Sequence, residues 1–512
     1  MRTALHLTSV LLLLAACSGD DDDNGTSPGP TGIETGTDTG TLVGLPGLTV
    51  TVSTVSPTII DVVAPAGIEG GALRATAEGS GAVEGSPTGS SGRLMGLAEG
   101  LTYDLVWSDS EGSAVATGEY RVPSRPTNLP AFDVAADSDH SLADGALVTT
   151  IIQPDGGWLV VLDDQGRYLF WYDLGHRGEA EPAFPGWDGA ALPITSRLQA
   201  GHLLASAYDT AQQQDVGRVW RIPVDAMTEA EITVTRTEWA HHDFVWHDDS
   251  GTMAWLGYQF ETIGSTRWVS DRILEAPEAT TSYDQVWSFF DDYGPTHGPI
   301  APISPETQGF SVPTLATHEW THGNSLMHDT DTDDYFVLSK FHDALLRIDR
   351  ATGATEWTLG GPNSDFALPG GGAVWVDPFT TELWSHAHMS HLWLDTSGTS
   401  GGFVVFDNGY HYESMEGGTL GWSKVSEYRF DEVARTVEKV WEVPHPEGRF
   451  TPLMGDVRKL DATDSLGPRY LVGWSSLACI EEMRADGSRA WEGCLPLGQI
   501  MGRTTWYEGL LP

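Results

Sequence analysis

Short apolar runs that alternate with polar residues recur along most of the chain, and they predict strands rather than helices. Residues 48–52 and 103–107 repeat with the period of two that places alternate side chains on opposite faces of a strand. Gly and Ser clusters separate such runs, and Pro123 and Pro126 follow the last of them. This pattern of short strands without helices predicts a small immunoglobulin-like or fibronectin-like β-sandwich over residues 46–125.

From about residue 130 onward a longer unit repeats. Each copy has an apolar residue, a short polar turn and then a strand that ends in Trp. The six strands end at Trp171, Trp239, Trp287, Trp357, Trp441 and Trp491. Repeats of this length with strand periodicity are typical of propeller blades, and loops inserted into a common four-stranded unit explain the unequal spacing. We therefore predict an all-β chain with a six-bladed β-propeller over residues 126–512; a large irregular β-sandwich is the alternative.

The beginning of the chain has the pattern of an export signal. Arg2 precedes an apolar run at 5–14, and small residues lead to Cys17. A cysteine at the cleavage point is the lipid acceptor of bacterial lipoproteins, so we predict a signal peptide over residues 1–17 with lipidated Cys17; an ordinary signal peptide with an incidental cysteine is the alternative. Residues 18–45 are acidic and rich in Gly and Thr, which predicts a disordered tether.

This leader sets the expected location. We predict an exported lipoprotein that is anchored to the lipid bilayer through N-terminal acyl chains. The folded part would then be periplasmic or exposed at the cell surface, with the outer membrane favoured.

Charge and cysteine content narrow the possibilities further. The formal net charge of −45 excludes nucleic acid as a partner, because phosphate contacts need clustered Lys and Arg. Two cysteines remain beside Cys17, and in an oxidising compartment a pair favours one disulfide. Cys479 and Cys494 flank the turn signal Asp486 and Gly487, so we predict that they are bridged across a hairpin.

Three histidines share one position in three of the repeats. Each begins a segment that runs into an apolar strand, and an Asp follows seven residues later at a turn. The histidines are His242, His322 and His388, and the aspartates are Asp249, Asp329 and Asp395. Because the first strand of each blade lines the central channel, we expect the three imidazoles to meet in one pocket, with His241, His318 and His386 nearby. The alternative is that each histidine only caps its own strand.

Metal binding is the rival interpretation of the histidines. His318 to His322 matches the HExxH pattern of zinc proteases, which requires a helix, but Pro313 before it and Gly323 after it disfavour one. His386, His388 and His391 could also ligate a metal, although on one strand the first two would share a face and the third would point away. We therefore predict no metal and no other cofactor.

The same segments resemble the bacterial arylsulfate sulfotransferases that need no nucleotide sulfonate donor. The resemblance covers the whole exported chain, as a small β-sandwich followed by a six-bladed propeller. The matching segments are residues 320–325, residues 337–350 with 357–361, residues 387–392 with 405–409, and residues 241–244. The resemblance implies an exported aryl sulfotransferase that moves a sulfuryl group from a phenolic sulfate ester to a phenol through a sulfohistidine intermediate.

The resemblance also implies roles for single residues. His388 would be the nucleophile, and His242 and His322 would be catalytic with it. Asn324, Lys340, His241 and His386 would bind the substrate. The family typically has Arg where Lys340 stands and Gln where Ala387 stands; lysine supplies charge but no two-pronged donor. The second function to be weighed is a non-catalytic propeller that binds a ligand or partner at the membrane surface.

Overall fold

The computed structural model describes most of the chain that follows the predicted tether. The described residues are 47–143, 145–153, 156–174, 191–209, 217–264, 266–280, 282–293, 317–377, 380–381, 383–409, 422–460 and 467–508. Cys17, the predicted signal peptide and the predicted tether lie outside these residues. Within them the regular structure is almost all strand, with one helix of four residues, α2 (Phe289–Asp292), and two short 3-10 turns, η2 (Glu229–Glu231) and η5 (Ser475–Leu477). No helix in this part of the chain has the length and apolar character needed to cross a bilayer.

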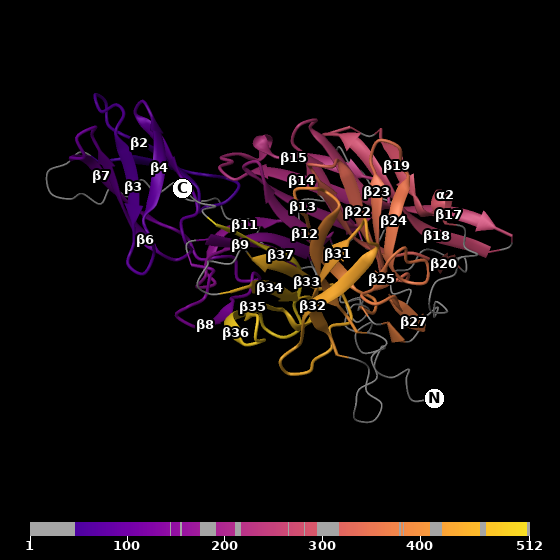
Figure 1. Ribbon diagram of the computed structural model, residues 1–512. Coiled ribbons are helices and arrows are strands. Elements are labelled where there is room, and N and C mark those ends of the chain that lie inside the picture. Colours follow the sequence, from indigo (N-terminus) through magenta and orange to yellow (C-terminus); the bar gives the residue numbers. More distant parts are fainter. Residues whose placement is uncertain are drawn as a thin grey trace, which may run out of the picture.

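The first seven strands form a separate module, coloured indigo in Figure 1. They are β1 (Thr49–Val52), β2 (Ile60–Val63), β3 (Ala72–Thr76), β4 (Val83–Thr88), β5 (Ser91–Leu94), β6 (Thr102–Ser108) and β7 (Ala114–Arg121), in the sheet order β1-β2-β5-β4-β3-β6-β7. The Leu48 N–H donates to the Thr117 carbonyl over 2.9 Å, which brings the start of β1 against β7. Burial alternates along β3 and β6, so one face packs around Leu73, Leu105 and Trp107. The module is thus a sandwich or barrel-like sheet.

In the rest of the described residues, six sheets are arranged as the blades of a propeller (Figure 1), which confirms the predicted fold. Blade 1 holds β9 (Gly145–Gln153), β10 (Gly156–Leu162) and β11 (Tyr168–Asp173); blade 2 holds β12 (Ala191–Gln199), β13 (His202–Asp209), β14 (Gly217–Pro223) and β15 (Thr233–Thr237). Blade 3 holds β16 (Ala240–His247), β17 (Thr252–Ile263), β18 (Thr266–Pro277) and β19 (Asp284–Ser288), with β20 (Thr317–Glu319) added beside β18. Blade 4 holds β21 (Gly323–Asp329), β22 (Asp334–Ser339), β23 (Ala344–Asp349) and β24 (Thr355–Gly360).

The last two blades carry small additions. Blade 5 holds β29 (His388–Leu394), β30 (Ser400–Asp407), β31 (Lys424–Asp431) and β32 (Thr436–Pro444), extended by β25 (Ala367–Leu368) and β26 (Gly372–Ala373). Blade 6 holds β33 (Asp456–Leu460), β34 (Arg469–Trp474), β35 (Cys479–Arg484) and β36 (Arg489–Cys494). A separate hairpin joins β27 (Trp375–Asp377) to β28 (Thr380–Thr381).

Two pairings far apart in sequence close the ring. The last strand, β37 (Ile500–Glu508), pairs with β9 and becomes the innermost strand of blade 1. The strand that precedes the propeller, β8 (Asp133–Ala136), pairs with β36 and becomes the outermost strand of blade 6. The inner strands β37, β12, β16, β21, β29 and β33 each contact the next one around the ring. Each end of the propeller thus pairs with a strand from near the other end, and these two pairings complete blades 1 and 6.

The six tryptophans mark the blades as the sequence predicts. Five lie in the outer strands β11, β19, β24, β32 and β36, and Trp239 lies just after β15. Trp287, Trp357 and Trp491 are almost fully buried. Large apolar side chains at this position fill the wide outer space between twisted blades, which is why the repeat is visible in the sequence.

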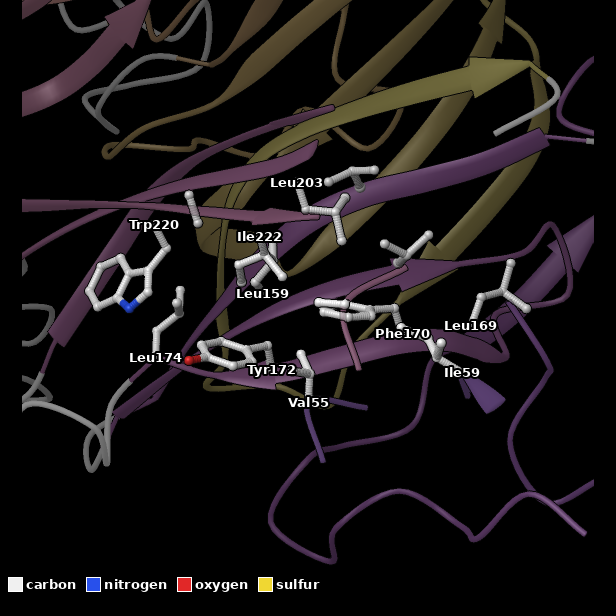
Figure 2. Close-up of a cluster of buried hydrophobic side chains, with 14 of the residues drawn as sticks. Val55, Ile59, Leu159, Leu169, Phe170, Tyr172, Leu174, Leu203, Trp220 and Ile222 are labelled. Carbon is white, nitrogen blue, oxygen red and sulfur yellow. The ribbon is translucent and has the colours of Figure 1, made fainter. Parts of the chain in front are cut away.

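The N-terminal module docks against blades 1 and 2. Figure 2 shows Val55 and Ile59 of the module packed among side chains of both blades, including Phe170 and Trp220. Hydrogen bonds reinforce this contact: the Thr54 N–H donates to the Met227 carbonyl over 2.9 Å. The module therefore shares a hydrophobic core with the propeller rather than hanging from it by a linker.

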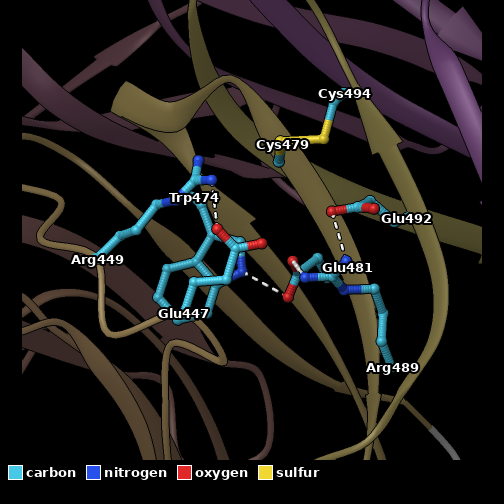
Figure 3. Close-up of a disulfide and its surroundings, with 8 residues drawn as sticks. All are labelled: Glu447, Arg449, Trp474, Cys479, Glu481, Arg489, Glu492 and Cys494. Atoms are coloured by element: carbon cyan, nitrogen blue, oxygen red, sulfur yellow. Dashed lines mark hydrogen bonds and ion pairs between the residues drawn. A yellow bond between two sulfur atoms is a disulfide. The ribbon is translucent and has the colours of Figure 1, made fainter.

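The predicted disulfide is confirmed. Cys479 and Cys494 are directly opposed on β35 and β36, with their Cα atoms 4.1 Å apart and their sulfur atoms bonded. Figure 3 shows the bridge beside Glu481, which accepts from the Trp474 indole over 2.9 Å and pairs with Arg489. The bridge joins the outer strands of blade 6 near the point where β8 closes the ring.

Candidate active site

Three inner strands bring the three predicted histidines together. His242 lies in β16, His322 lies just before β21, and His388 begins β29. The ring centroids of His242 and His322 are 4.7 Å apart, and those of His242 and His388 are 6.0 Å apart. One ring nitrogen from each histidine lies within 4.8 Å of the others, and all three residues are buried. Side chains from three blades thus meet in one buried cluster.

The backbone conformation that orients these side chains differs from the prediction in blade 5. His242 and His322 adopt left-handed backbone conformations, with φ of 50° and 53°. In blade 5 the left-handed residue is His386, with φ of 55°, and His388 follows two residues later. The predicted equivalence of His388 with the other two is therefore wrong in register, as is the shared strand face of His386 and His388, because β29 begins only at His388. The bulges near the starts of the three inner strands absorb the difference.

Asn408 fixes the ring of His388. Its Nδ2 donates to the carbonyls of Thr451 and Met454 over 2.7 and 3.0 Å, so its Oδ1 is left to face His388 Nδ1 at 2.6 Å. An amide oxygen only accepts, so His388 Nδ1 must carry the proton. His388 Nε2 then keeps its lone pair.

Burial keeps the His388 imidazole neutral. Burial and the charge of Lys340 lower the pKa of His388 well below its ordinary value, although the hydrogen bond that His388 donates to Asn408 acts in the other direction. Burial also lowers the pKa of His242, together with the neighbouring His322 and His241. The site therefore holds imidazoles whose lone pairs are available at neutral pH.

His242 is backed by a second histidine and a carboxylate. Its Nδ1 lies 2.9 Å from His241 Nδ1, and His241 Nε2 lies 2.9 Å from Asp271 Oδ1. The His241 ring stacks on Tyr258 with the centroids 4.0 Å apart. The predicted substrate-binding residue His241 therefore stands behind His242, beside a carboxylate.

Asn324 and His322 join blades 3, 4 and 5. Asn324 is fully buried, and its Nδ2 donates to the Ala387 carbonyl over 2.9 Å. The ring of His322 contacts Phe341, which also contacts His386. Asn324 thus fixes the backbone one residue before His388, and Phe341 lies beside both His322 and His386.

Lys340 lies at the end of β22, next to the histidines. Its backbone N–H donates to the His322 carbonyl over 3.0 Å, and its charge contributes to the lowered pKa values of His242 and His388. Close by, burial and Asp407 raise the pKa of Asp343 well above its usual range, and Asp343 Oδ1 accepts from the His386 N–H over 2.5 Å. Lys340 therefore adds positive charge, whereas the neighbouring Asp343 is held towards its neutral form.

The structure adds an arginine that no sequence pattern predicts. Arg503, on the inner strand β37, is buried, and its charge contributes to the lowered pKa of His388. Asp243 pairs with Arg503 over 2.7 Å and with Arg197 over 2.6 Å, and accepts from the Leu326 N–H over 2.6 Å. No local pattern marks Arg503, because only the ring closure brings β37 to the centre.

These surroundings bear on the question of a metal. Three imidazole nitrogens at this spacing suit a metal ion in principle. The charges of Lys340 and Arg503 act on the same histidines, however, and cations oppose a divalent ion while favouring an anion. The zinc-protease pattern also lacks its helix, since His318 lies in strand β20. The site is better suited to a negatively charged group that reacts with an imidazole.

A small cavity adjoins the site between blades 2 and 3. Its lining includes Arg218, His241, His242 and Asp243. Arg218 is almost fully buried. The cavity places a further cation behind the histidines.

Comparison with known proteins gives one family. The model of the arylsulfotransferase (ASST) family matches residues 158–471, a stretch that contains all three histidines. Arylsulfate sulfotransferase AssT of Escherichia coli is 28% identical over 169 residues, which are 30% of this chain and 27% of that protein. The match thus spans well under two thirds of the relative's length.

The solved structures that this chain resembles are distant in sequence. An auxiliary nutrient binding protein from Bacteroides ovatus is 9% identical with a TM-score of 0.32, covering 88% of this chain and 90% of that chain. The periplasmic gluconolactonase of Pseudomonas aeruginosa is 11% identical with a TM-score of 0.37, covering 71% of this chain and 98% of that chain.

Proposed function

Because this chain belongs to the arylsulfotransferase (ASST) family, we propose that it transfers a sulfuryl group from a phenolic sulfate ester to a phenol through a sulfohistidine at His388. The observation that carries the proposal is the hydrogen bond of 2.6 Å between His388 Nδ1 and Asn408 Oδ1. This hydrogen bond leaves the lone pair on His388 Nε2, and burial keeps the His388 imidazole neutral. A nucleophile needs this lone pair.

In the first half of the reaction His388 Nε2 forms a bond to sulfur and the bond from sulfur to the phenolic oxygen breaks. The departing oxygen takes a proton and leaves as a phenol. In the second half another phenol attacks the same sulfur, loses its proton, and restores the free imidazole. The two halves balance, since the proton taken up in the first is returned in the second.

Positive charge supports the transferred group. The sulfuryl oxygens keep negative charge throughout the transfer, so cations and N–H donors stabilise them. Lys340 and Arg503 both act on His388 from different blades, and the ring nitrogens of His242 and His322 lie within 4.8 Å of its own. The predicted roles of His242 and His322 as catalytic residues, and of Asn324, Lys340 and His386 as substrate-binding residues, remain part of this proposal. His241, predicted to bind substrate, lies behind His242 and would act through it.

The experiment is an adduct-trapping assay with matched variants. The purified protein is incubated with a chromogenic aryl sulfate, with and without a phenol acceptor, and peptide mass spectrometry maps any sulfuryl mass increment. We expect the increment on His388 in the absence of acceptor, and none in His388→Ala. His391→Ala is the matched control, because His391 lies on the same strand outside the three-histidine cluster. No turnover and no adduct across several phenolic donors would instead favour a non-catalytic binding propeller.

We also propose that the protein is exported and held at a membrane by lipid on Cys17. The apolar run that ends in small residues before Cys17 supports this, and so does the disulfide between Cys479 and Cys494, which persists in oxidising compartments. Mass spectrometry of the mature protein should find a diacylated or triacylated Cys17 as its first residue. An N-terminus without lipid, or cleaved elsewhere, would contradict the proposal.

A further inference from the structure

A line of three polar side chains runs from strand β18 to the centre of the propeller. Asp271 Oδ1 lies 2.9 Å from His241 Nε2, and His241 Nδ1 lies 2.9 Å from His242 Nδ1. All three side chains are buried. We refer to Asp271, His241 and His242 as the relay. His242 is its inner end, since its ring alone among the three lies against His322 and His388.

The outer end of the relay is held in one orientation. Asp271 Oδ2 accepts from the Gly323 N–H over 2.5 Å and from the Thr321 hydroxyl. Burial works to raise the pKa of Asp271, but the contacts with His241 and Thr321 outweigh it, and the pKa lies below its usual value. Asp271 is therefore a carboxylate, and its Oδ1, 2.9 Å from His241 Nε2, favours the tautomer of His241 with the proton on Nε2.

These contacts leave two arrangements of protons. The two Nδ1 atoms at 2.9 Å hold one proton between them, because two lone pairs or two N–H groups would repel. When that proton is on His242, His241 is neutral and His242 Nε2 offers a lone pair. When it is on His241, His241 is an imidazolium beside the Asp271 carboxylate, and a neutral His242 carries a proton on Nε2.

We propose that Asp271 and His241 make His242 the acid and the base of the reaction, by storing one proton as an ion pair behind it; this inference rests on the sulfuryl transfer proposed above. His242 is the catalytic residue, since its ring faces the reacting centre. Asp271 and His241 are positioning residues that act through it. Burial and the charges of His322, His241, His388 and Lys340 disfavour an imidazolium at His242. His241 is the ring that contacts the Asp271 carboxylate.

The stored proton balances the two halves of the reaction. In the first half the S–O bond breaks, the departing phenolic oxygen takes the proton from His242 Nε2, and His242 Nδ1 regains a proton from His241. In the second half the attacking phenol gives its proton to His242 Nε2, and the Nδ1 proton returns to His241. His242 exchanges one tautomer for the other and stays neutral, while His241 gains or loses the charge.

The three histidines are not interchangeable in this role. His388 is backed by Asn408, a neutral amide that accepts one proton and offers no charge to balance an imidazolium. His322 also acts on the Asp271 carboxylate, since its charge contributes to the lowered pKa of Asp271, and its ring meets His242 and Phe341. What distinguishes His242 is the second imidazole, His241, which lies between its Nδ1 and that carboxylate.

Asp271→Asn tests the relay because the surrounding donors fix the orientation of the new amide. The Gly323 N–H and the Thr321 hydroxyl hold an oxygen at the Oδ2 position, so the new amide nitrogen must face His241 Nε2. His241 then accepts there and donates from Nδ1, which leaves His242 with its proton on Nε2. Passing that proton on would turn His241 into an imidazolate, so His242 can serve neither as acid nor as base.

The measurement is the rate of adduct formation with two donors, 4-nitrophenyl sulfate and phenyl sulfate. The nitrophenolate leaves without a proton, whereas phenolate needs one. For Asp271→Asn we expect a loss of about 10²-fold or more with phenyl sulfate, in the range of general acid catalysis, and a change of less than about threefold with the nitrophenyl donor. An equal loss with both donors would show a merely structural role and overturn the inference.

Two further variants keep the test decisive. His241→Phe preserves the ring that stacks on Tyr258 but removes both nitrogens, and it should show the same dependence on the donor even if Asp271→Asn does not fold. Glu482→Gln removes a buried carboxylate in blade 6 and should leave the ratio of the two rates unchanged. Failure of the wild type to form the adduct with either donor would overturn the proposed function and this inference together.

Discussion

Blades 3, 4 and 5 line the centre of the propeller with histidine, whereas blades 1, 2 and 6 line it with charge. His242, His322 and His388 come from the first three, near the starts of β16, β21 and β29. Arg503, Arg197 and Asp456 come from the other three, on β37, β12 and β33. We refer to the inner strands of blades 3, 4 and 5 as the histidine half of the propeller, and to those of blades 1, 2 and 6 as the charged half.

The division separates two physical tasks. An imidazole reacts through a lone pair, which burial protects by keeping the ring neutral. A fixed charge stabilises the negative oxygens of a transferred group, and it does so best where water is excluded. Asp243 joins the halves, since this residue of blade 3 pairs with Arg197 and Arg503. The comparison predicts that changes in the histidine half affect chemistry and that changes in the charged half affect binding.

The largest effect should follow from His388→Ala. Without the nucleophile the rate of sulfuryl transfer should fall by about 10⁴-fold or more, as when the nucleophile of other covalent catalysts is removed. Steady-state kinetics with an aryl sulfate and a phenol measure the loss, with His391→Ala as the control. Substantial turnover by His388→Ala would end the assignment of covalent chemistry to the histidine half.

The next largest effect should follow from Asn408→Leu. The substitution removes the acceptor that holds the proton on His388 Nδ1, so the ring no longer presents Nε2 in one tautomer. We expect adduct formation to slow by about 10²-fold, within the range of losses when the partner that orients a reactive histidine is replaced. A rate equal to that of the wild type would contradict the orienting role.

In the charged half, Arg503→Met should weaken binding more than chemistry. We expect the dissociation constant of the aryl sulfate to rise by about tenfold, the cost of roughly one lost charge-assisted contact. The stability should fall by about 3 kcal/mol as well, because the buried Asp243 carboxylate loses the buried one of its two cations. Single-turnover kinetics over a range of donor concentrations and denaturant titration measure the two effects. A loss confined to the rate at saturating donor would show that the halves do not divide the tasks as proposed.

Lys340→Arg should have a smaller effect. A guanidinium at this position offers a two-pronged donor to an anion in place of a single ammonium. We expect donor affinity to rise by about two- to fivefold, with little change in the rate at saturation. A weaker affinity than that of the wild type would indicate that the site is shaped around the ammonium.

The smallest effect should be that of mild acid on His388. Burial and Lys340 lower the pKa of His388, so the imidazole stays neutral as the pH falls through 6.5, where an exposed histidine would lose its lone pair to a proton. With 4-nitrophenyl sulfate, adduct formation should therefore stay constant between about pH 7.5 and 6. A decline centred near pH 6.5 would show that the histidine half does not protect its nucleophile.

Local patterns in the sequence were enough for the architecture. Alternation of apolar and polar residues reports which face of a strand is buried, and the Trp at each outer strand reports the wide space between blades. The disulfide was predictable for the same reason, because Cys479 and Cys494 flank a hairpin turn and so lie opposite each other. The convergence of His242, His322 and His388 also followed, since equivalent strand starts surround one axis.

The partners of those histidines were decided by the tertiary structure alone. Asn408, Asp271 and Arg503 lie on or next to strands other than those of the histidines, and bulges and left-handed residues at the strand starts set where each ring points. The sequence carries no local mark of such directions. Arg503 reaches the centre only because β37 pairs with β9 to close the ring, a contact between distant parts of the chain. The sequence therefore determined which residue types surround the axis, and only packing across blades decided which nitrogen of each ring is free to react.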